Sequence, residues 1–183
     1  DITFCDVSDM TEFYRLFGRR YGALDEYRMD DAETVLVMAG SFSTKGKAAV
    51  NRWREQGRRV GLVRLRMIRP QAVGHLARSL AGRKAVGVID QNISPGLGGI
   101  LFQEVAGALA TAPERPPVMR SFVGGLGGKD ISQAEFDHVR EVLDKVKPGD
   151  GPVPCQLLYT DAEYQQVKTA LSVAGKPLEG TAS

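Results

Sequence analysis

Four short apolar runs recur along the chain, and each is followed by a segment with the spacing of a helix. The runs cover 35–39, 60–68, 85–89 and 118–123, and glycine- or proline-containing turns separate them from the helical segments. Apolar strands that alternate with helices of ten to fifteen residues are typical of a parallel sheet with helices on both faces. We therefore expect an α/β fold with a mostly parallel sheet, although the pattern does not reveal the order of the strands.

The helical segments carry recognisable start and stop signals. Ser43 or Thr44 is predicted to cap the first helix and Gly57 to end it. Pro70 is expected to open the next helix, which should end at Gly82. Trp53 falls on the apolar stripe of the first of these helices, so we expect it to face the core or an interface.

Further helices follow in the second half of the chain. One is expected over 100–109, with Leu101, Val105 and Leu109 facing inward. Two capping boxes, one formed by Ser132 and Glu135 and one by Thr160 and Glu163, predict the starts of two more. A short strand over 156–159 is expected at the sheet edge between them.

The two ends differ from the central part. Residues 8–17 have helical spacing, whereas 19–34 read as a connector without a sustained period, and the last residues as a frayed tail. We therefore divide the chain into an N-terminal helix and connector (1–33), an α/β domain (34–147) and a C-terminal extension with a strand, a helix and a tail (148–183).

Composition excludes several classes of function. The net charge of +2 gives no bulk attraction to nucleic acid, and no apolar run is long enough to cross a membrane. The first ten residues lack the basic and apolar regions of a signal peptide. The two cysteines, Cys5 and Cys155, fit neither an iron–sulfur cluster nor a zinc site. We expect reduced thiols and a cytoplasmic protein that binds neither nucleic acid nor membranes.

Ligands of open α/β sheets bind beyond the carboxyl ends of the strands. Two glycine-rich loops follow strands here, but neither "GLGG" at 96–99 nor "GGLGGKD" at 124–130 has the spacing of a phosphate-binding loop. We favour structural or interface roles for these glycines over contact with a ligand.

Three arginines lie at the end of the second apolar run. Arg64 and Arg66 are two residues apart, so they point to the same face of the strand, and Arg69 follows shortly after. Such a group binds a phosphate or carboxylate, or pairs with acidic groups of a partner chain. We favour the interface because no phosphate loop accompanies the arginines.

The ordinary signs of an autonomous catalytic site are missing from the sequence. His75 and His138 have no nucleophile or metal-ligand partner at a recognisable spacing. Asp90 ends a strand, where a carboxylate acts as an acid–base group or, more commonly, accepts hydrogen bonds from loop N–H groups. We therefore predict no catalytic residue and no metal site in this chain.

Three motifs, in order, resemble a known family. "YGALDEYRMDDAETVLVMAGSFSTKGKAAVNRWREQGRRVGLVRLRMIRP", "SPGLGGILFQEVAGAL" and "FVGGLGGKDISQAEF" are similar to the C-terminal domain of the α chain of 2-oxoacid:ferredoxin oxidoreductases, the pyruvate:ferredoxin oxidoreductase group. The resemblance covers roughly 19–146. It implies a domain like the C-terminal domain of transketolase, a three-layer α/β/α unit with a five-stranded, mostly parallel sheet.

The resemblance also implies a function. Enzymes of this family decarboxylate a 2-oxoacid on thiamine diphosphate, pass electrons through iron–sulfur clusters to a ferredoxin-type acceptor, and usually form an acyl-CoA. The matching domain binds none of these cofactors itself, so thiamine diphosphate, iron–sulfur clusters and CoA are expected only in the complete enzyme. Its expected partners are the other domains or subunits of the oxidoreductase, with ferredoxin or another acceptor reached through the complex. The family's catalytic residues lie upstream of the matched segment.

Two departures leave the oxoacid open. The family commonly has Arg-Pro-Phe-Pro where this chain has Gln71 and Ala72 after Arg69–Pro70, and an arginine where this chain has Gln91. A relative that acts on an aryl or branched-chain oxoacid is therefore compatible with the resemblance.

We thus expect a non-catalytic assembly domain of a thiamine-dependent 2-oxoacid oxidoreductase. The alternatives are a small CoA- or nucleotide-binding module, or the C-terminal domain of a transketolase or of a dehydrogenase E1-type enzyme. The candidate interface or ligand-contact residues are Ser41, Arg64, Arg66, Arg69, Gly96, Gly98, Gly99, Gly127 and Gly128.

Overall fold

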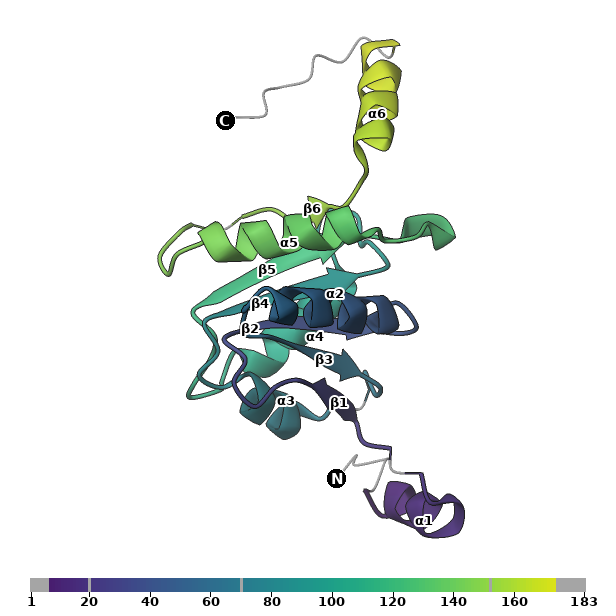
Figure 1. The fold of residues 1–183 in the computed structure, drawn as a ribbon, viewed down its shortest axis with the longest axis vertical. Coiled ribbons are helices and arrows are strands. Elements are labelled where there is room, and N and C mark those ends of the chain that lie inside the picture. The colour runs from purple at the N-terminus through teal and green to yellow at the C-terminus, as the bar shows by residue number, and fades with distance from the viewer. Residues whose placement is uncertain (1–6, 20, 70, 152, 174–183) are drawn as a thin grey trace.

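A computed structural model of the chain describes residues 7–19, 21–69, 71–151 and 153–173. Its centre is a six-stranded sheet in the order β1-β3-β2-β4-β5-β6 (Figure 1). The strands are β1 (Leu24–Tyr27), β2 (Thr34–Ala39), β3 (Val60–Leu65), β4 (Ala85–Asp90), β5 (Val118–Val123) and β6 (Gln156–Leu157). Only β1 runs antiparallel to its neighbour. The predicted mostly parallel α/β class is therefore confirmed.

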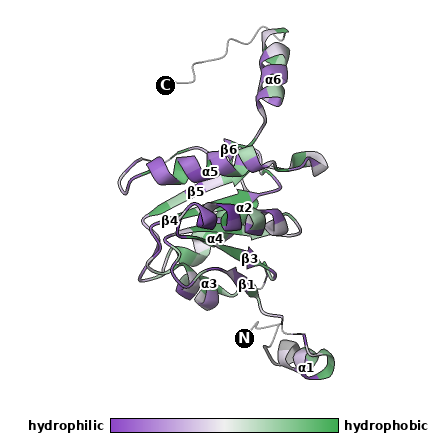
Figure 2. Ribbon diagram, viewed as in Figure 1, coloured by the Kyte–Doolittle hydropathy of each residue, from purple (hydrophilic) through white to green (hydrophobic). Residues whose placement is uncertain are grey.

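Helices cover both faces of the sheet. One face carries α2 (Ser43–Glu55) and α5 (Gln133–Lys145), and the other carries α3 (Val73–Leu80) and α4 (Ile100–Leu109). Successive residues of β2 serve the two faces in turn: Leu36 and Met38 join the core under α2 and α5, and Val35 and Val37 join the core under α3 and α4. Figure 2 shows apolar residues on the central strands and mainly hydrophilic residues along α2 and α5.

Trp53 joins α2 to α5. It is fully buried, as its place on the helix stripe predicts, and its indole Nε1 donates a hydrogen bond to Oδ1 of Asp137 on α5 at 2.7 Å. Gly46 of the same helix allows close approach to the sheet, because a Cβ there would lie 2.6 Å from side-chain atoms of Leu62 and Met38. Hence α2 is held against α5 through Trp53 and against the sheet at Gly46.

Two helices stand apart from this body. The first, α1 (Val7–Phe17), and the last, α6 (Asp161–Val173), project at opposite ends of the molecule (Figure 1). None of the residues of α6 is buried. A short 3₁₀ helix, η1 (Leu126–Gly128), follows β5. No helix among the described residues is long and apolar enough to cross a membrane.

Several local signals are confirmed. Both capping boxes form: Glu135 N donates to Ser132 Oγ, and Glu163 N to Thr160 Oγ1, while the two glutamates accept from Ser132 N and Thr160 N. Gly57 and Gly82 follow their helices with left-handed backbone, at φ of 78° and 69°. The 100–109 helix and the 118–123 strand have the predicted bounds.

Other predictions were wrong. The sheet has six strands rather than five, since part of the predicted connector forms β1 at the edge. Residue 42 precedes α2 without a side-chain cap, and Ser43 instead lies inside the helix, where its hydroxyl donates to Gly40 O at 2.7 Å. The strand from Val60 ends at Leu65, and α3 begins only at Val73. Pro70, the predicted start of that helix, lies outside the described residues.

Candidate interface at the carboxyl end of the sheet

Because β2 to β6 are parallel, the loops that follow them gather at one edge of the sheet. Contacts between three loops confirm this. A Cβ on Gly40 would lie 3.3 Å from Oε1 of Gln91, and one on Gly125 would lie 3.5 Å from the ring of Phe42. The glycine candidates and Ser41 therefore belong to one surface, which we call the carboxyl edge. It comprises residues 40–42, 91–99 and 124–130.

Asp90 organises the loop after β4. Its side chain is buried, and its carboxylate accepts the backbone N–H groups of Leu101 (2.6 Å) and Phe102 (3.1 Å) in the first turn of α4. Burial raises the pKa of Asp90, and these two N–H donors offset part of that rise. Asp90 thus caps α4 from the end of β4, which is the second of the two roles considered for it.

Packing explains the glycines that precede α4. A Cβ on Gly99 would lie 2.1 Å from Oδ2 of Asp90, and one on Gly98 would lie 2.6 Å from Cβ of Cys155. Gly96 and Gly98 also have φ of 81° and 86°, in a tight turn closed by hydrogen bonds between Ser94 and Gly98. Gly98 and Gly99 are therefore required by packing within the protein, and Gly96 by its left-handed backbone.

The loop after β5 reaches its shape differently. Gly125, Gly127 and Gly128 have φ of 73°, 66° and 83°, and a Cβ on Gly127 or Gly128 would meet no atom within 4 Å. The lysine that follows, Lys129, bonds to Glu135 of α5 at 2.8 Å and to Glu163 of α6 at 2.6 Å. Its ammonium group is therefore engaged by two carboxylates, which disfavours a phosphate at this loop.

The charges of this network reinforce each other. Burial opposes the charge of Lys129, but the hydrogen bonds to Glu135 and Glu163 outweigh it and raise the pKa of Lys129. The hydrogen bond from Lys129, together with the N–H of Thr160, lowers the pKa of Glu163 to about 2. Lys45 of α2 also pairs with Asp130. The loop after β5 is thus tied to three helices.

The three arginines do not converge on one site. Arg66 pairs with Asp25 of β1 at 3.3 Å and lies over the ring of Tyr21, whereas Arg69 pairs with Glu104 of α4. Arg64 is half-buried in β3, directly opposite Asp25, and has no ion pair with another described residue. The hypothesis of a shared anion site is therefore not supported by the geometry.

Asp25 fixes the edge strand to the body. It accepts from Lys47 of α2 at 2.8 Å as well as from Arg66. Burial of Asp25 works against its charge, but Lys47 and Arg66 outweigh burial and lower the pKa of this carboxyl. Asp25 was not among the candidates predicted from the sequence, because it lies in the supposed connector. Its signal would have been the short alternating run around it.

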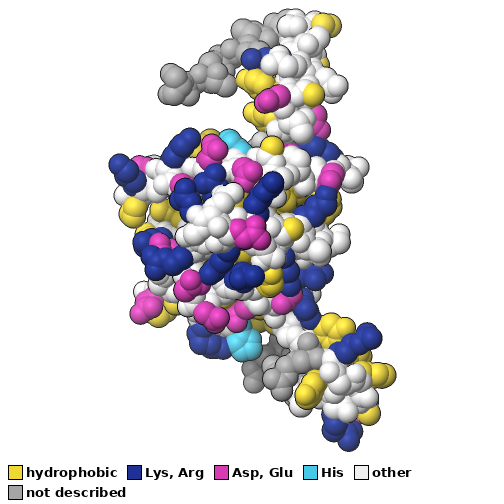
Figure 3. Space-filling view, viewed as in Figure 1, with side chains coloured by type: hydrophobic (Ala, Val, Ile, Leu, Met, Phe, Trp, Pro, Cys, Tyr) yellow, Lys and Arg dark blue, Asp and Glu magenta, His cyan; other side chains and the backbone are white. Residues whose placement is uncertain are grey.

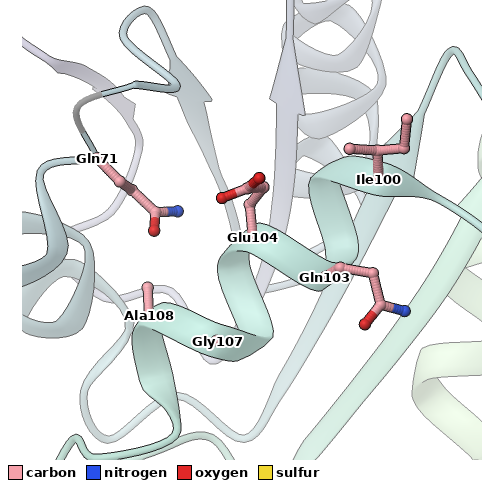
Figure 4. Close-up of a pocket in the computed structure, with 6 residues that line it drawn as sticks. All are labelled: Gln71, Ile100, Gln103, Glu104, Gly107 and Ala108. Carbon is pink, nitrogen blue, oxygen red and sulfur yellow. The ribbon is translucent and has the colours of Figure 1, made fainter.

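A shallow, open depression of about 290 Å³ lies against α4, lined by Gln71, Ile100, Gln103, Glu104, Gly107 and Ala108 (Figure 4). Gln71 points its amide toward Glu104 across the depression, and its Nε2 is buried without a hydrogen-bond partner among the described residues. None of these lining residues was a sequence candidate. Glu104 on α4 could not be matched to Arg69 without the strand order.

The remaining candidate residues are not gathered into a site. His75, His138 and Ser41 are exposed, and the described residues contain no cluster of three or more His, Cys, Asp or Glu that could hold a metal. Charges of both signs are interspersed over the face shown in Figure 3. By contrast, apolar side chains are exposed at or beside the carboxyl edge: Ile93 (45%), Leu97 (64%), Ile100 (43%) and Leu126 (40%).

The known proteins that this chain resembles include subunits of two 2-oxoacid oxidoreductases. Pyruvate synthase subunit PorA of Thermotoga maritima is 39% identical over 133 residues, which is 73% of this chain and 33% of that protein. Ketoisovalerate oxidoreductase subunit VorA of Pyrococcus abyssi is 37% identical over 136 residues, 74% of this chain and 34% of that protein. The chain thus spans about a third of the length of the curated relatives it matches.

A solved structure and a family model complete the comparison. The 2-oxoglutarate:ferredoxin oxidoreductase of Magnetococcus marinus aligns with a TM-score of 0.49 and 14% identity, over 77% of this chain and 24% of that chain. The model of the pyruvate:ferredoxin oxidoreductase core domain II matches residues 32–136, more than half of the chain. Together with the identity to the PorA and VorA subunits, this match shows that the chain belongs to the pyruvate:ferredoxin oxidoreductase core domain II family.

Proposed function

We propose that this chain is a non-catalytic assembly domain of a 2-oxoacid oxidoreductase, and that its carboxyl edge packs against the catalytic parts of that enzyme. The complete enzyme would decarboxylate a 2-oxoacid on thiamine diphosphate and pass the electrons through iron–sulfur clusters to ferredoxin or a similar acceptor, usually with formation of an acyl-CoA. The observation that carries the proposal is the family match over 32–136.

The range of relatives supports a role that is independent of the oxoacid. A subunit of pyruvate synthase and a subunit of ketoisovalerate oxidoreductase match almost the same share of the chain with almost the same identity. A domain that selected the substrate would be expected to resemble one group more than the other. We therefore infer that selection occurs elsewhere in the enzyme.

The carboxyl edge supports an interface over a ligand site. Two cations that could bind an anion are already engaged within the chain, Lys129 by two glutamates and Arg66 by Asp25. The carboxylate of Asp90 is likewise engaged, by N–H groups of α4. The edge also exposes large apolar side chains, with Leu97 and Leu126 in its two glycine loops. Depletion of free charge and exposure of apolar side chains are typical of the central part of a protein interface.

The cofactors would belong to other parts of the enzyme. An iron–sulfur cluster generally takes four cysteine ligands, whereas this chain has two cysteines far apart in the sequence. Neither glycine loop has the spacing of a phosphate-binding loop, and the packing of Gly98 and Gly99 leaves no cradle there. The residues of this chain therefore do not fit an iron–sulfur cluster or the phosphate groups of a cofactor.

A graft tests the proposal in a complete enzyme. We would replace the matching segment of the Thermotoga maritima PorA subunit with residues of this chain, coexpress it with the remaining subunits, and measure pyruvate-dependent reduction of a viologen dye. We expect assembly and activity with the grafted domain. Leu97→Glu with Leu126→Glu should release the grafted subunit from the complex on gel filtration. Ala110→Glu, an exposed control inside the grafted segment at the far end of α4, should not.

Two outcomes would contradict the proposal. One is an assembled enzyme that tolerates both edge substitutions, because the carboxyl edge would then face solvent. The other is binding by the 183-residue chain itself: calorimetric titration with CoA should give no heat, and micromolar binding would favour the CoA-binding module instead.

A further inference from the structure

The carboxylate of Asp25 on β1 lies among three cations on the α2 side of the sheet. Lys47 of α2 donates a hydrogen bond to it at 2.8 Å, and Arg66 pairs with it at 3.3 Å. Arg64 lies directly opposite Asp25 in the antiparallel register of β1 and β3, so the two side chains share one face of the sheet. That face is the one under α2, because Leu62, two residues earlier in β3, packs in the core there. We call these four charged residues the Asp25 cluster.

The positive charge of the cluster is not balanced by other groups that the structure describes around it. Two further carboxylates that pair with α2 are engaged elsewhere, Asp31 with Arg54 and Asp130 with Lys45. The first turn of α2 carries no acidic residue, and the N-terminal end of a helix itself has a partial positive charge. Arg64 makes no ion pair with another described residue. One carboxylate therefore faces an excess of cations.

Partial burial makes this excess costly. The side chains of Asp25, Lys47 and Arg66 are exposed to only 21%, 27% and 29%, and Arg64 is half-buried. Like charges repel each other more strongly there than on an open surface, because the effective dielectric constant is lower. The cluster therefore attracts an anion.

The surroundings of the cluster favour a carboxylate of a polypeptide over a phosphate. The turn before α2 lacks the spacing of a phosphate-binding loop. The chain spans about a third of the length of its relatives, so those proteins contain far more polypeptide than this chain. Arg64 also lies near the carboxyl end of β3, on the side of the sheet where apolar side chains are exposed for contact. An aspartate or glutamate can accept two parallel hydrogen bonds from one guanidinium group.

We propose that Arg64 pairs, in the complete oxidoreductase, with an aspartate or glutamate from a part of the enzyme outside this chain. Asp25 prepares the site, because it holds Lys47 and Arg66 beside Arg64. The guanidinium of Arg66 is held further by the ring of Tyr21, 5.0 Å away. Such a pair fixes the register of an interface more than its strength. This inference rests on the proposed function, since it requires the catalytic parts as neighbours.

Urea denaturation of the 183-residue chain tests whether Arg64 has a partner within the chain. Arg64→Met should leave the urea midpoint unchanged or raise it, because the substitution removes repulsion and no ion pair. Asp25→Asn should lower the midpoint, and Arg64→Met added to Asp25→Asn should recover part of the loss, most clearly at low salt. An Arg64→Met chain as destabilised as Asp25→Asn would overturn the inference.

Chemical cross-linking in the complete enzyme identifies the partner. The PorA graft described above, extended to include β1, would carry Arg64→Lys and be treated with a carbodiimide, which joins an amine to a carboxylate in contact with it. Mass spectrometry should find residue 64 linked to an aspartate or glutamate outside the graft. The control is Arg52→Lys, at an exposed position in the last turn of α2 where the arginine has no ion pair with a described residue. It should give at least tenfold less of any such link.

The outcomes separate this inference from the proposed function. A graft that does not assemble even with Arg64 in place contradicts both. An assembled, active graft in which residue 64 links only to Asp25, or to nothing, contradicts this inference alone.

Titration of the chain with inorganic phosphate tests the other kind of anion. We expect no binding that depends on Arg64. Binding tighter than about 1 mM in calorimetry that is lost with Arg64→Met would assign the Asp25 cluster to a phosphate ligand and overturn the pairing with a carboxylate.

Discussion

The loop after β4 and the loop after β5 are both rich in glycine, but their glycines serve different physical needs. In the first loop, Gly98 and Gly99 leave room for Cys155 and Asp90. In the second, Gly127 and Gly128 face open space, and only their left-handed backbone requires glycine. The first loop is therefore held by packing and the second by backbone geometry and ion pairs. Substitutions should separate these two causes.

The largest effect is expected at Gly99. Its φ of −71° suits any residue, so Gly99→Ala tests packing alone. Because the new methyl group would lie 2.1 Å from Oδ2 of Asp90, we expect a loss of about 3 kcal/mol of unfolding free energy. Urea denaturation measures it. Gly107→Ala, in the exposed part of α4 with open space around it, is the control and should stabilise by about 0.5–1 kcal/mol. Equal effects of both variants would contradict the packing argument.

The next largest loss of stability is expected when the carboxylate of Asp90 is removed. Asp90→Ala leaves the N–H groups of Leu101 and Phe102 without their acceptor, at a cost of about 2 kcal/mol. Urea denaturation at neutral pH measures this loss. A value close to zero would mean that water replaces the carboxylate, and would remove Asp90 as the anchor of α4.

The same residue predicts a dependence on pH. The pKa of Asp90 is raised in the folded protein, so the folded state binds more protons than the unfolded state between the ordinary and the raised value. Stability should therefore fall as pH rises through this window. Asp90→Asn, which has no charge to bury, should lack that component. The difference in unfolding free energy between wild type and Asp90→Asn, measured from pH 3 upward, should change in this direction.

A smaller loss of unfolding free energy is expected when the ion pairs of the loop after β5 are removed. Lys129→Met removes the cation from Glu135, whose side chain is almost fully buried, and from Glu163. We expect a loss of about 1–2 kcal/mol, mainly from the stranded Glu135. The pKa of Glu163 should rise from about 2 toward the ordinary value of 4.5. In the wild type, the contribution of Glu163 is present above its ordinary pKa and is lost as pH falls through the lowered one.

Carboxyl NMR of Glu163 in both proteins measures the shift. The control is Lys168→Met, also on α6, because the ammonium of Lys168 lies over the ring of Tyr164. An unchanged midpoint for Glu163 in Lys129→Met would mean that the capping interaction with Thr160 alone sets its pKa.

The parts of this fold that could be predicted are those decided locally. Apolar runs gave the strands from Val35 to Val123, and the serine–glutamate and threonine–glutamate pairs gave two helix starts, because such signals need only neighbouring residues. The edge strand β1 was missed because its partner, β3, lies some forty residues later. Its charged residues pair with α2 and with the end of β3 rather than with each other.

Only the location of the candidate site could be predicted from the sequence. Parallel strands guarantee that the loops meet at the carboxyl edge, so the sequence could point to Gly96–Gly99 and Gly124–Gly128 without the strand order. It could not show that Arg66 and Arg69 turn to opposite faces of the sheet, toward Asp25 and Glu104. Which cation meets which carboxylate depends on packing between elements distant in sequence.

The smallest effect isolates backbone conformation and sharpens the comparison most. Gly127 (φ 66°) in the second loop and Gly96 (φ 81°) in the first both have open space where a Cβ would be. If packing is what distinguishes the loops, Gly127→Ala and Gly96→Ala should cost the same, about 1 kcal/mol each, because both lose only the ease of a left-handed backbone. Gly98→Ala adds to a similar φ of 86° a contact of 2.6 Å with Cβ of Cys155. It should therefore cost clearly more than Gly96→Ala in urea denaturation. Equal costs for all three would mean that the loop relaxes around Cys155, and that left-handed backbone alone explains the glycines that precede Gly99.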